Sequence, residues 1–251
     1  MPFVQIGERR IFYSAHGKRG LPIVLIHGAA GNHLVWSLQV RALGDVGRVI
    51  ALDLPGHGRS DPPGCDTLDA YRDLVLGVLD ALQFERAVIV GHSMGGAIAQ
   101  TLALTHPGRV SGLGLIGTGA RLRVHPDILA GILTHPDEIA AYVIAYSYTA
   151  ITPELRRRAE AEFRACPPSI AHGDFIACNQ FDALACVSQI AAPTLVLCGK
   201  QDRMTPPKFS VYLAKQIPNA VLVLVDEAGH SVMLEQPEPV NAALGDWVKR
   251  L

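Results

Sequence analysis

The sequence lacks closely spaced cysteine pairs. Its five cysteines are odd in number and none forms a CxxC pair; they are Cys65, Cys166, Cys178, Cys186 and Cys198. Structural zinc sites and thioredoxin-like redox sites use such pairs, and disulfide frameworks of secreted proteins use even numbers of cysteines. We therefore expect reduced, mostly buried thiols, no metal site, and a cytoplasmic location.

An excess of either charge is also missing. The chain carries 22 basic and 23 acidic side chains, which gives a formal net charge of −1 and a pI near 6.8. Nucleic acids and anionic membranes are held by clusters of basic side chains. We therefore expect neither nucleic acid nor membrane as a partner. A small neutral or apolar ligand agrees better with this charge balance. The composition leaves the oligomeric state open.

No apolar run is long enough to cross a bilayer, which takes about 20 residues. Outside the region around Ser93, the longest run extends from Ile139 to Tyr146. Near the N-terminus, Glu8, Arg9 and Arg10 stand where a signal peptide would need its apolar core. We expect a soluble protein that is not exported by that route.

What the sequence does contain is an alternation of short apolar segments with helical ones. The apolar segments are 22–27, 48–53, 86–91, 112–116, 193–199 and 220–225, after an opening hairpin of 3–6 and 9–15. The helical segments are 34–43, 68–82, 94–105, 208–216 and 239–251. Short, continuously apolar runs are typical of strands buried on both faces of a parallel sheet. The alternation predicts an α/β fold, a mostly parallel twisted sheet with helices on both faces.

One interval is too long for an ordinary crossover between parallel strands. Residues 117–192 separate two predicted strands, whereas a crossover needs about a dozen residues or a few more. Within it, 135–150 and 152–166 are helical in pattern. Prolines mark helix starts and breaks at Pro126, Pro136, Pro153, Pro167 and Pro168. The pattern predicts an inserted group of about four helices.

The stretch 87–100, AVIVGHSMGGAIAQ, places one serine in a glycine-rich turn. Gly91 to Gly95 fits G-x-S-x-G, and it follows a predicted strand and precedes a predicted helix. Such a sharp turn forces its central residue into strained backbone angles and requires small neighbours. It would lift the Ser93 hydroxyl clear of the sheet, at a helix N-terminus that favours negative charge. The stretch therefore indicates a nucleophilic serine.

A serine hydroxyl needs a base to take its proton, and the base needs an orienting group. Asp202 comes just past the strand 193–199, and His230 lies in the loop after 220–225. Ser93, Asp202 and His230 therefore all fall at the carboxyl edge of the predicted sheet, where open α/β sheets hold their sites.

Other acids and histidines compete for these roles. Asp226 lies only four residues before His230, and Asp53 also follows a predicted strand. We favour Asp202 because of its place at the strand end. His92 and His27 belong to the turn motifs, so we expect structural roles for them.

Five motifs, taken in order, resemble those of the α/β-hydrolase superfamily, specifically its small capped esterase-like members. They are HGAAG (27–31), DLPGHGRSD (53–61), GHSMGG (91–96), GKQDRMTPP (199–207) and AGHSVMLEQPE (228–238). The resemblance covers nearly the whole chain. It implies an α/β-hydrolase core at 1–118 and 189–251, with an inserted helical cap at 119–188.

The resemblance also implies the roles of the site residues. Ser93 would be the nucleophile, His230 the general base and then the general acid, and Asp202 the residue that orients the imidazole. The family's oxyanion hole uses two backbone N–H groups, which correspond here to Ala29 and Met94.

The substrate is less well defined by the sequence. The cap should roof a pocket, and Tyr142, Tyr146, Phe175 and Phe181 are candidates for its wall or for the core of the cap. We expect cleavage of small carboxylic esters through an acyl-enzyme. A lactonase or carbon–carbon bond hydrolase, a peroxide-dependent or acyl-transfer enzyme, and a non-enzymatic ligand receptor are the alternatives. An aspartate nucleophile is excluded because residue 93 is serine.

One further motif has a weaker context. Residues 112–117, GLGLIG, fit the G-x-G-x-x-G dinucleotide fingerprint. That fingerprint should follow a strand and open a helix, whereas these glycines lie within a predicted strand. A phosphate-binding loop and a metal-ligand cluster are also missing, so the sequence implies no cofactor.

Overall fold

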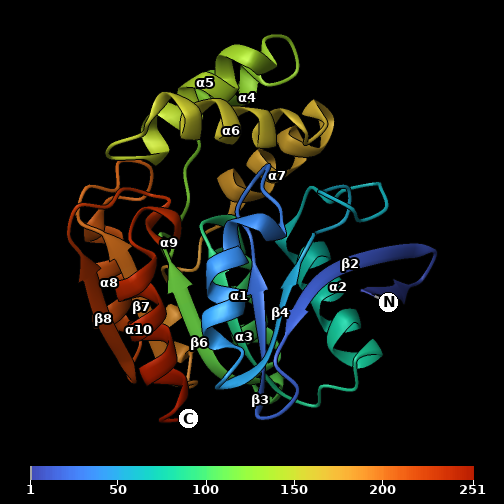
Figure 1. Cartoon of the computed structure of the whole chain (residues 1–251), viewed down its shortest axis with the longest axis vertical. Helices are drawn as coiled ribbons and strands as arrows, with labels where there is room; N and C mark the ends of the chain where they lie inside the picture. Colours follow the sequence, from blue (N-terminus) through green and yellow to red (C-terminus); the bar gives the residue numbers. More distant parts are fainter. Residues whose placement is uncertain (1) are drawn as a thin grey trace.

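The computed structural model describes residues 2–251, which form a twisted sheet of eight strands with helices on both faces (Figure 1). The strands are β1 (Phe3–Ile6), β2 (Arg9–His16), β3 (Leu21–Ile26), β4 (Gly47–Leu52), β5 (Ala87–His92), β6 (Val110–Ile116), β7 (Thr194–Gly199) and β8 (Ala220–Val225). Their order across the sheet is β1-β2-β4-β3-β5-β6-β7-β8. β1 and β2 are antiparallel at one edge, and the pairs from β4 to β8 are parallel. The predicted fold class is confirmed.

The helices cover the two faces of the sheet because successive side chains of each strand point to opposite sides. On β3, Ile23 packs with α1 (Ser37–Leu43) and α10 (Pro237–Val248). Its neighbour Val24 packs on the other face. The helices of that face are α2 (Leu68–Ala81), α3 (Met94–Thr105) and α8 (Pro207–Gln216). Both faces of the central strands are therefore buried, which explains their continuous apolar runs.

The helix expected over 34–43 is divided. A 3-10 turn, η1 (His33–Trp36), precedes α1, and a short helix, α9 (Val232–Glu235), precedes α10. The Asn32 side chain accepts a hydrogen bond from Leu34 N at 2.9 Å and so caps η1. Short 3-10 turns at helix starts are common because they satisfy some of the unpaired N–H groups.

The chain between β6 and β7 contains α4 (Pro126–Gly131), α5 (Pro136–Ser147), α6 (Pro153–Arg164) and α7 (Pro168–Gln180). We call this chain the inserted segment, and Figure 1 shows its helices gathered over one end of the sheet. Each of these helices begins with proline, whose fixed φ suits the first helical position. A bridge between Arg121 and Asp182 joins the two ends of the segment. Its exact boundaries at 119 and 188 stay a prediction.

Among residues 2–251, no helix combines the length and the apolar character that crossing a membrane requires. The short 3-10 turns η2 (Pro107–Arg109) and η3 (Val187–Gln189) complete the elements.

The glycines of 112–117 are explained by packing. A Cβ on Gly112 would lie 2.5 Å from Leu251 Cδ1, and one on Gly114 would lie 2.9 Å from the Val90 side chain. Both glycines lie inside β6 rather than in a turn that opens a helix. The structure thus places them where neighbouring side chains approach the strand closely.

Candidate active site

Ser93 occupies the sharp turn between β5 and α3. Its φ is +54° and its ψ is −117°, a conformation that costs free energy for any residue except glycine. The turn is held from β6: Ser93 N donates to Ile116 O at 3.0 Å, and Thr118 Oγ1 donates to Ser93 O at 2.9 Å. The strained backbone of the serine is therefore fixed on both sides.

The glycines around Ser93 are required by close backbone approach. A Cβ on Gly91 would lie 2.0 Å from Gly95 O, and one on Gly95 would lie 2.3 Å from Ile26 O. A Cβ on Gly96 would lie 2.6 Å from the Thr118 side chain. Only glycine fits these three positions without displacing the turn.

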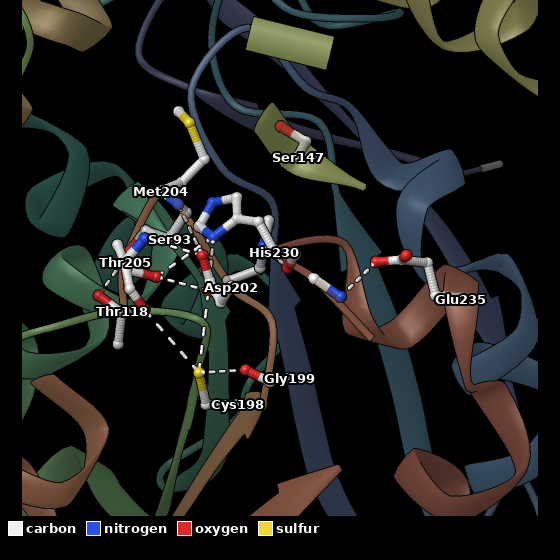
Figure 2. A network of polar contacts seen from close by, with 12 residues as sticks. Ser93, Thr118, Ser147, Cys198, Gly199, Asp202, Met204, Thr205, His230 and Glu235 are labelled. Atoms are coloured by element: carbon white, nitrogen blue, oxygen red, sulfur yellow. Dashed lines mark hydrogen bonds and ion pairs between the residues drawn. The ribbon is translucent and has the colours of Figure 1, made fainter. Parts of the chain in front are cut away.

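Asp202 and His230 form a direct pair (Figure 2). His230 Nδ1 lies 2.9 Å from Asp202 Oδ2, and both side chains are buried. Because a carboxylate can only accept, Nδ1 carries the proton. The other ring nitrogen, Nε2, is then free to accept a proton, which is the state that a general base needs.

The pKa of Asp202 is lowered despite its burial. Burial acts to raise this pKa. The charge and hydrogen bond of His230, together with the hydrogen bonds from Thr205, lower it by more than burial raises it. Thr205 donates from its N and its Oγ1, both at 2.8 Å, and Met204 N donates at 2.9 Å. The Cys198 thiol lies 3.8 Å from Oδ2. Asp202 is therefore an ionised acceptor in a ring of donors.

The two competing acids have other partners. Asp226 is exposed and pairs with Lys200 Nζ at 2.7 Å. Asp53 is buried, but it accepts from the N and Nδ1 of His33 and from Arg59 N, all within the loops after β3 and β4. Within residues 2–251, the carboxylate that pairs with His230 is that of Asp202, not that of Asp53 or Asp226.

The loop that carries His230 is held by several hydrogen bonds. Glu235 accepts from Gly229 N at 2.8 Å, and Ser231 N donates to Ser147 O at 2.9 Å in α5. His92 Nε2 lies 3.0 Å from His230 O. The pKa of His92 is lowered to about 3, mainly by burial and to a smaller extent by the neighbouring His230. The His92 ring is therefore neutral, and its Nε2 donates to His230 O. His92 thus supports the backbone of His230, as its place in the turn motif suggested.

Ser93 and His230 border the same cavity, which has a volume of about 120 Å³. Within residues 2–251, no hydrogen bond links the Ser93 hydroxyl to the His230 ring. The structure therefore pairs Asp202 with His230 and places Ser93 on the cavity that His230 borders. In enzymes without substrate, such contacts are often loose and tighten in the reacting complex. The cavity also has one acidic wall residue that the sequence did not single out, Glu162 of α6.

The predicted pocket wall needs correction. Phe175 borders the cavity, but Tyr142, Tyr146 and Phe181 do not. Tyr142 and Tyr146 stack on each other at 4.6 Å on the outer side of α5, each more than a third exposed. Phe181 is buried in the main core at the end of α7. The inserted segment instead contributes Val143, Ile144, Ser147, Tyr148, Ala159, Glu162, Phe163 and Phe175 to the wall.

The N–H groups of the two expected oxyanion donors, Ala29 and Met94, are not used in hydrogen bonds within residues 2–251. Ala29 lies in the loop 27–31 after β3, which we call the oxyanion loop, and Met94 is the first residue of α3. Ala29 borders the cavity, whereas the Met94 side chain is buried in the core.

A buried polar cluster joins the inserted segment to the oxyanion loop. Asp174 of α7 accepts at Oδ2 from Ala30 N and from His57 Nε2, both at 2.8 Å. Its Oδ1 accepts from the Tyr71 hydroxyl. Asp174, His57 and Tyr71 are fully buried. No motif in the sequence pointed to this cluster, although Asp174 is the only acidic residue between Arg164 and Asp182.

His57 is charged within this cluster. Its Nδ1 lies 3.1 Å from Pro55 O and its Nε2 faces Asp174, so both nitrogens have acceptors that cannot donate. Burial acts to lower the pKa of His57, but Asp174 raises it well above the ordinary value. Burial and the charge on His57 lower the pKa of the neighbouring His27 to about 4. Neutral His27 accepts from Leu54 N at 3.0 Å and donates to Gly28 O at 2.8 Å.

The chain is similar to proteins of one family, the alpha/beta hydrolases. A family model described as alpha/beta hydrolase fold matches residues 22–237. The 2-hydroxymuconate semialdehyde hydrolase of Pseudomonas sp. (strain CF600) is 29% identical over 249 residues, covering 91% of this chain and 87% of that protein.

Two solved structures cover nearly the whole chain. The enol-lactonase from Burkholderia xenovorans LB400 has a TM-score of 0.93 and 26% identity, over 99% of this chain and 100% of that one. A thermophilic esterase has a TM-score of 0.90 and 32% identity, over 99% of this chain and 96% of that one. The relatives share one fold but differ in the bond they are named for.

Proposed function

The chain belongs to the alpha/beta hydrolase fold family, and we propose that it is a serine hydrolase that cleaves small carboxylic esters. The observation that carries the proposal is that His230, hydrogen-bonded to Asp202, borders the same cavity as Ser93. A base oriented by an ionised acid, beside a serine at a strained turn, is the arrangement that activates a hydroxyl nucleophile.

In the first half of the reaction, Ser93 Oγ attacks the ester carbonyl while His230 Nε2 takes the hydroxyl proton. The carbonyl oxygen becomes an oxyanion, which the N–H groups of Ala29 and Met94 would stabilise. Asp202 stabilises the imidazolium. The carbon–oxygen bond to the alcohol then breaks, and His230 returns the proton to the leaving alcohol. An acyl group remains on Ser93.

In the second half, water replaces the alcohol. His230 Nε2 takes a proton from the water as its oxygen attacks the acyl carbonyl, and the same N–H groups hold the oxyanion. Collapse of this intermediate releases the carboxylic acid, and the proton on His230 returns to Ser93 Oγ. The residues of this chain supply every group in the scheme, so we propose that it needs no cofactor and no metal.

The cavity supports small acyl groups as substrates. Its volume is about 120 Å³, and much of its wall is apolar. Val143, Ile144 and Phe175 would face the alkyl or aryl part of the ester and gain from its removal from water. We therefore propose a small-molecule partner rather than nucleic acid or membrane. We also propose a cytoplasmic location, which the five free cysteines support.

A second candidate is the cleavage of a lactone or of a carbon–carbon bond with the same three residues. The likeness to an enol-lactonase at a TM-score of 0.93 supports the first, and the likeness to a 2-hydroxymuconate semialdehyde hydrolase supports the second. Both chemistries place a carbonyl at Ser93 and form an oxyanion. A non-enzymatic receptor and a transferase that uses another acceptor than water are the remaining alternatives.

A substrate panel tests these proposals. The panel contains p-nitrophenyl acetate and butyrate, a γ-lactone, an enol-lactone and a vinylogous 1,5-diketone of the kind formed by ring cleavage. We expect the highest kcat/KM for the aryl esters, with release of one carboxylic acid per alcohol. A higher kcat/KM for a lactone or diketone would move the assignment to that bond. No turnover of any member, with measurable binding, would favour the receptor.

A further inference from the structure

We propose that Asp174, on the inserted helix α7, is a positioning residue that holds the oxyanion loop in the geometry needed for catalysis. Figure 1 shows α7 among the helices gathered over one end of the sheet. Asp174 accepts from Ala30 N in the oxyanion loop, across 144 positions of sequence. The inference rests on the proposed function, because it concerns where the Ala29 N–H points when an oxyanion forms.

The peptide that contains the Ala29 N–H is fixed from its carbonyl side. Gly28 O accepts from Gly31 N at 3.1 Å and from His27 Nδ1 at 2.8 Å. The C=O and N–H of a trans peptide point in opposite directions in one plane. These two hydrogen bonds on Gly28 O therefore turn the Ala29 N–H away from the loop interior.

The next peptide in the oxyanion loop is fixed by Asp174. Ala30 has a φ of +53°, a left-handed conformation that is uncommon for alanine and does not persist without support. The hydrogen bond from Ala30 N to Asp174 Oδ2 supplies this support at 2.8 Å. Without this hydrogen bond, Ala30 could relax to a negative φ. The backbone of Ala29 would then have to rotate to keep the loop closed, and the Ala29 N–H would change direction.

The anchor itself is held rigidly. Asp174 is fully buried, and a buried carboxylate is costly unless it is paired and hydrogen-bonded. Charged His57, from the loop after β4, and the Tyr71 hydroxyl, from α2, supply that pairing. Two separate elements thus fix the carboxylate, which leaves Oδ2 a fixed acceptor for Ala30 N.

The test separates positioning from a general structural role. Asp174→Ala removes the acceptor, whereas Asp174→Asn can present its amide oxygen to Ala30 N in place of Oδ2. Cys178→Ala is the matched control, because Cys178 lies one turn further along α7, is 5% exposed and, within residues 2–251, forms no hydrogen bond with the oxyanion loop. Each variant is assayed with p-nitrophenyl butyrate, and active sites are counted by end-point labelling with a fluorophosphonate.

Two inhibitors report the oxyanion directly. The first inhibitor is a trifluoromethyl ketone that carries the acyl chain of the ester substrate. Ser93 Oγ adds to its carbonyl carbon, the hydroxyl proton passes to His230, and the resulting hemiketal oxyanion would occupy the oxyanion hole. The corresponding secondary alcohol binds the same pocket without forming an oxyanion. The ratio of the two inhibition constants is therefore a measure of the hole that a merely loosened pocket would not change.

We expect Asp174→Ala to lower kcat by about 10- to 100-fold, part of the effect of losing one oxyanion donor, with KM changed by less than about threefold. The inhibition constant of the ketone should rise by the same factor as kcat falls, while that of the alcohol stays constant. Asp174→Asn should retain kcat within about fivefold, and Cys178→Ala should lose stability but keep kcat per active site.

Wild-type kcat per active site in Asp174→Ala would overturn the inference, and so would a parallel loss of ketone and alcohol affinity. If Asp174→Ala does not fold, Asp174→Glu takes its place, since it keeps the charge beside His57 but moves the oxygens by one methylene. A wild-type protein that neither hydrolyses the ester nor binds the ketone would instead contradict the proposed function.

Discussion

His230 donates a hydrogen bond from Nδ1 to Oδ2 of Asp202 across 2.9 Å, within a ring of donors that keeps the carboxylate ionised. Asp202→Asn would favour the wrong imidazole tautomer and remove the charge that stabilises the imidazolium. We expect turnover of an aryl ester to fall by up to about 10⁴-fold. Steady-state kinetics at neutral pH measure this loss.

Asp226→Asn is the matched control for that variant. Asp226 is exposed and pairs with Lys200, so its loss should change turnover by less than about twofold. Circular dichroism establishes that both variants are folded. Greater damage from Asp226→Asn than from Asp202→Asn would move the orienting acid to Asp226.

The backbone strain at Ser93 predicts a difference between two inactive variants. Ser93→Ala keeps a Cβ at a φ of +54°, whereas Ser93→Gly removes it. Relief of strain of about 1–3 kcal/mol should exceed the greater chain freedom of glycine when unfolded, about 0.5–1 kcal/mol. We therefore expect urea unfolding to give Ser93→Gly the higher free energy of unfolding. A lower value than that of Ser93→Ala would show that the turn stores no strain at this residue.

The buried pair of His57 and Asp174 predicts a pH-dependent stability. Asp174 raises the pKa of His57 above its unfolded value of about 6.5, despite the opposing effect of burial. A raised folded-state pKa contributes stability that is complete below the unfolded pKa and is lost as pH rises through the folded pKa. The free energy of unfolding of the wild type, relative to His57→Gln, should therefore decrease above about pH 6.5. Urea titrations across this range test it, and a constant difference would contradict the charged state of His57.

Glu235 links the loop that carries His230 to the inserted segment. It accepts from Gly229 N at 2.8 Å and from Thr149 N at 2.7 Å. Glu235→Ala should lower the free energy of unfolding by about 1–3 kcal/mol and reduce kcat several-fold, because the loop that holds His230 loosens. Glu235→Gln keeps one acceptor and should lose less.

Glu227→Ala serves as the control for Glu235, since Glu227 is exposed in the same loop and, within residues 2–251, its carboxylate forms no hydrogen bond or ion pair. Thermal unfolding and steady-state kinetics are measured on all three variants. Equal effects of Glu227→Ala and Glu235→Ala would show that the two hydrogen bonds are unimportant for the loop.

The sequence predicted the parts of the site that depend on local pattern. Continuous apolar runs marked the central strands, and the glycines around Ser93 marked the turn, because close packing there excludes every larger residue. Since the carboxyl ends of parallel strands share one edge, the placement of Asp202 and His230 near each other followed from topology. Their contact at 2.9 Å is a result of the structure.

The parts that escaped prediction depend on which face of a helix is buried and on contacts across long stretches of sequence. Tyr142 and Tyr146 are aromatic residues of the inserted segment and so were candidates for the wall, but α5 turns Val143 toward the cavity and leaves the two tyrosines outside. Tyrosine suits such a surface because its hydroxyl can meet water. Asp174 contacts residues 103 and 144 positions away, so no local pattern could assign its partners.

Turnover by wild type and Ser93→Ala, combined with covalent labelling, tests the serine mechanism most directly. Ala fits the turn and only the hydroxyl is lost, so Ser93→Ala should fold normally but lose roughly 10⁴- to 10⁶-fold in kcat for p-nitrophenyl butyrate. A fluorophosphonate should label the wild type at Ser93 alone, as read by peptide mass spectrometry, and should not label Ser93→Ala. Undiminished turnover in the folded Ser93→Ala variant, or labelling of the wild type at another residue, would contradict the assignment of Ser93 as the nucleophile.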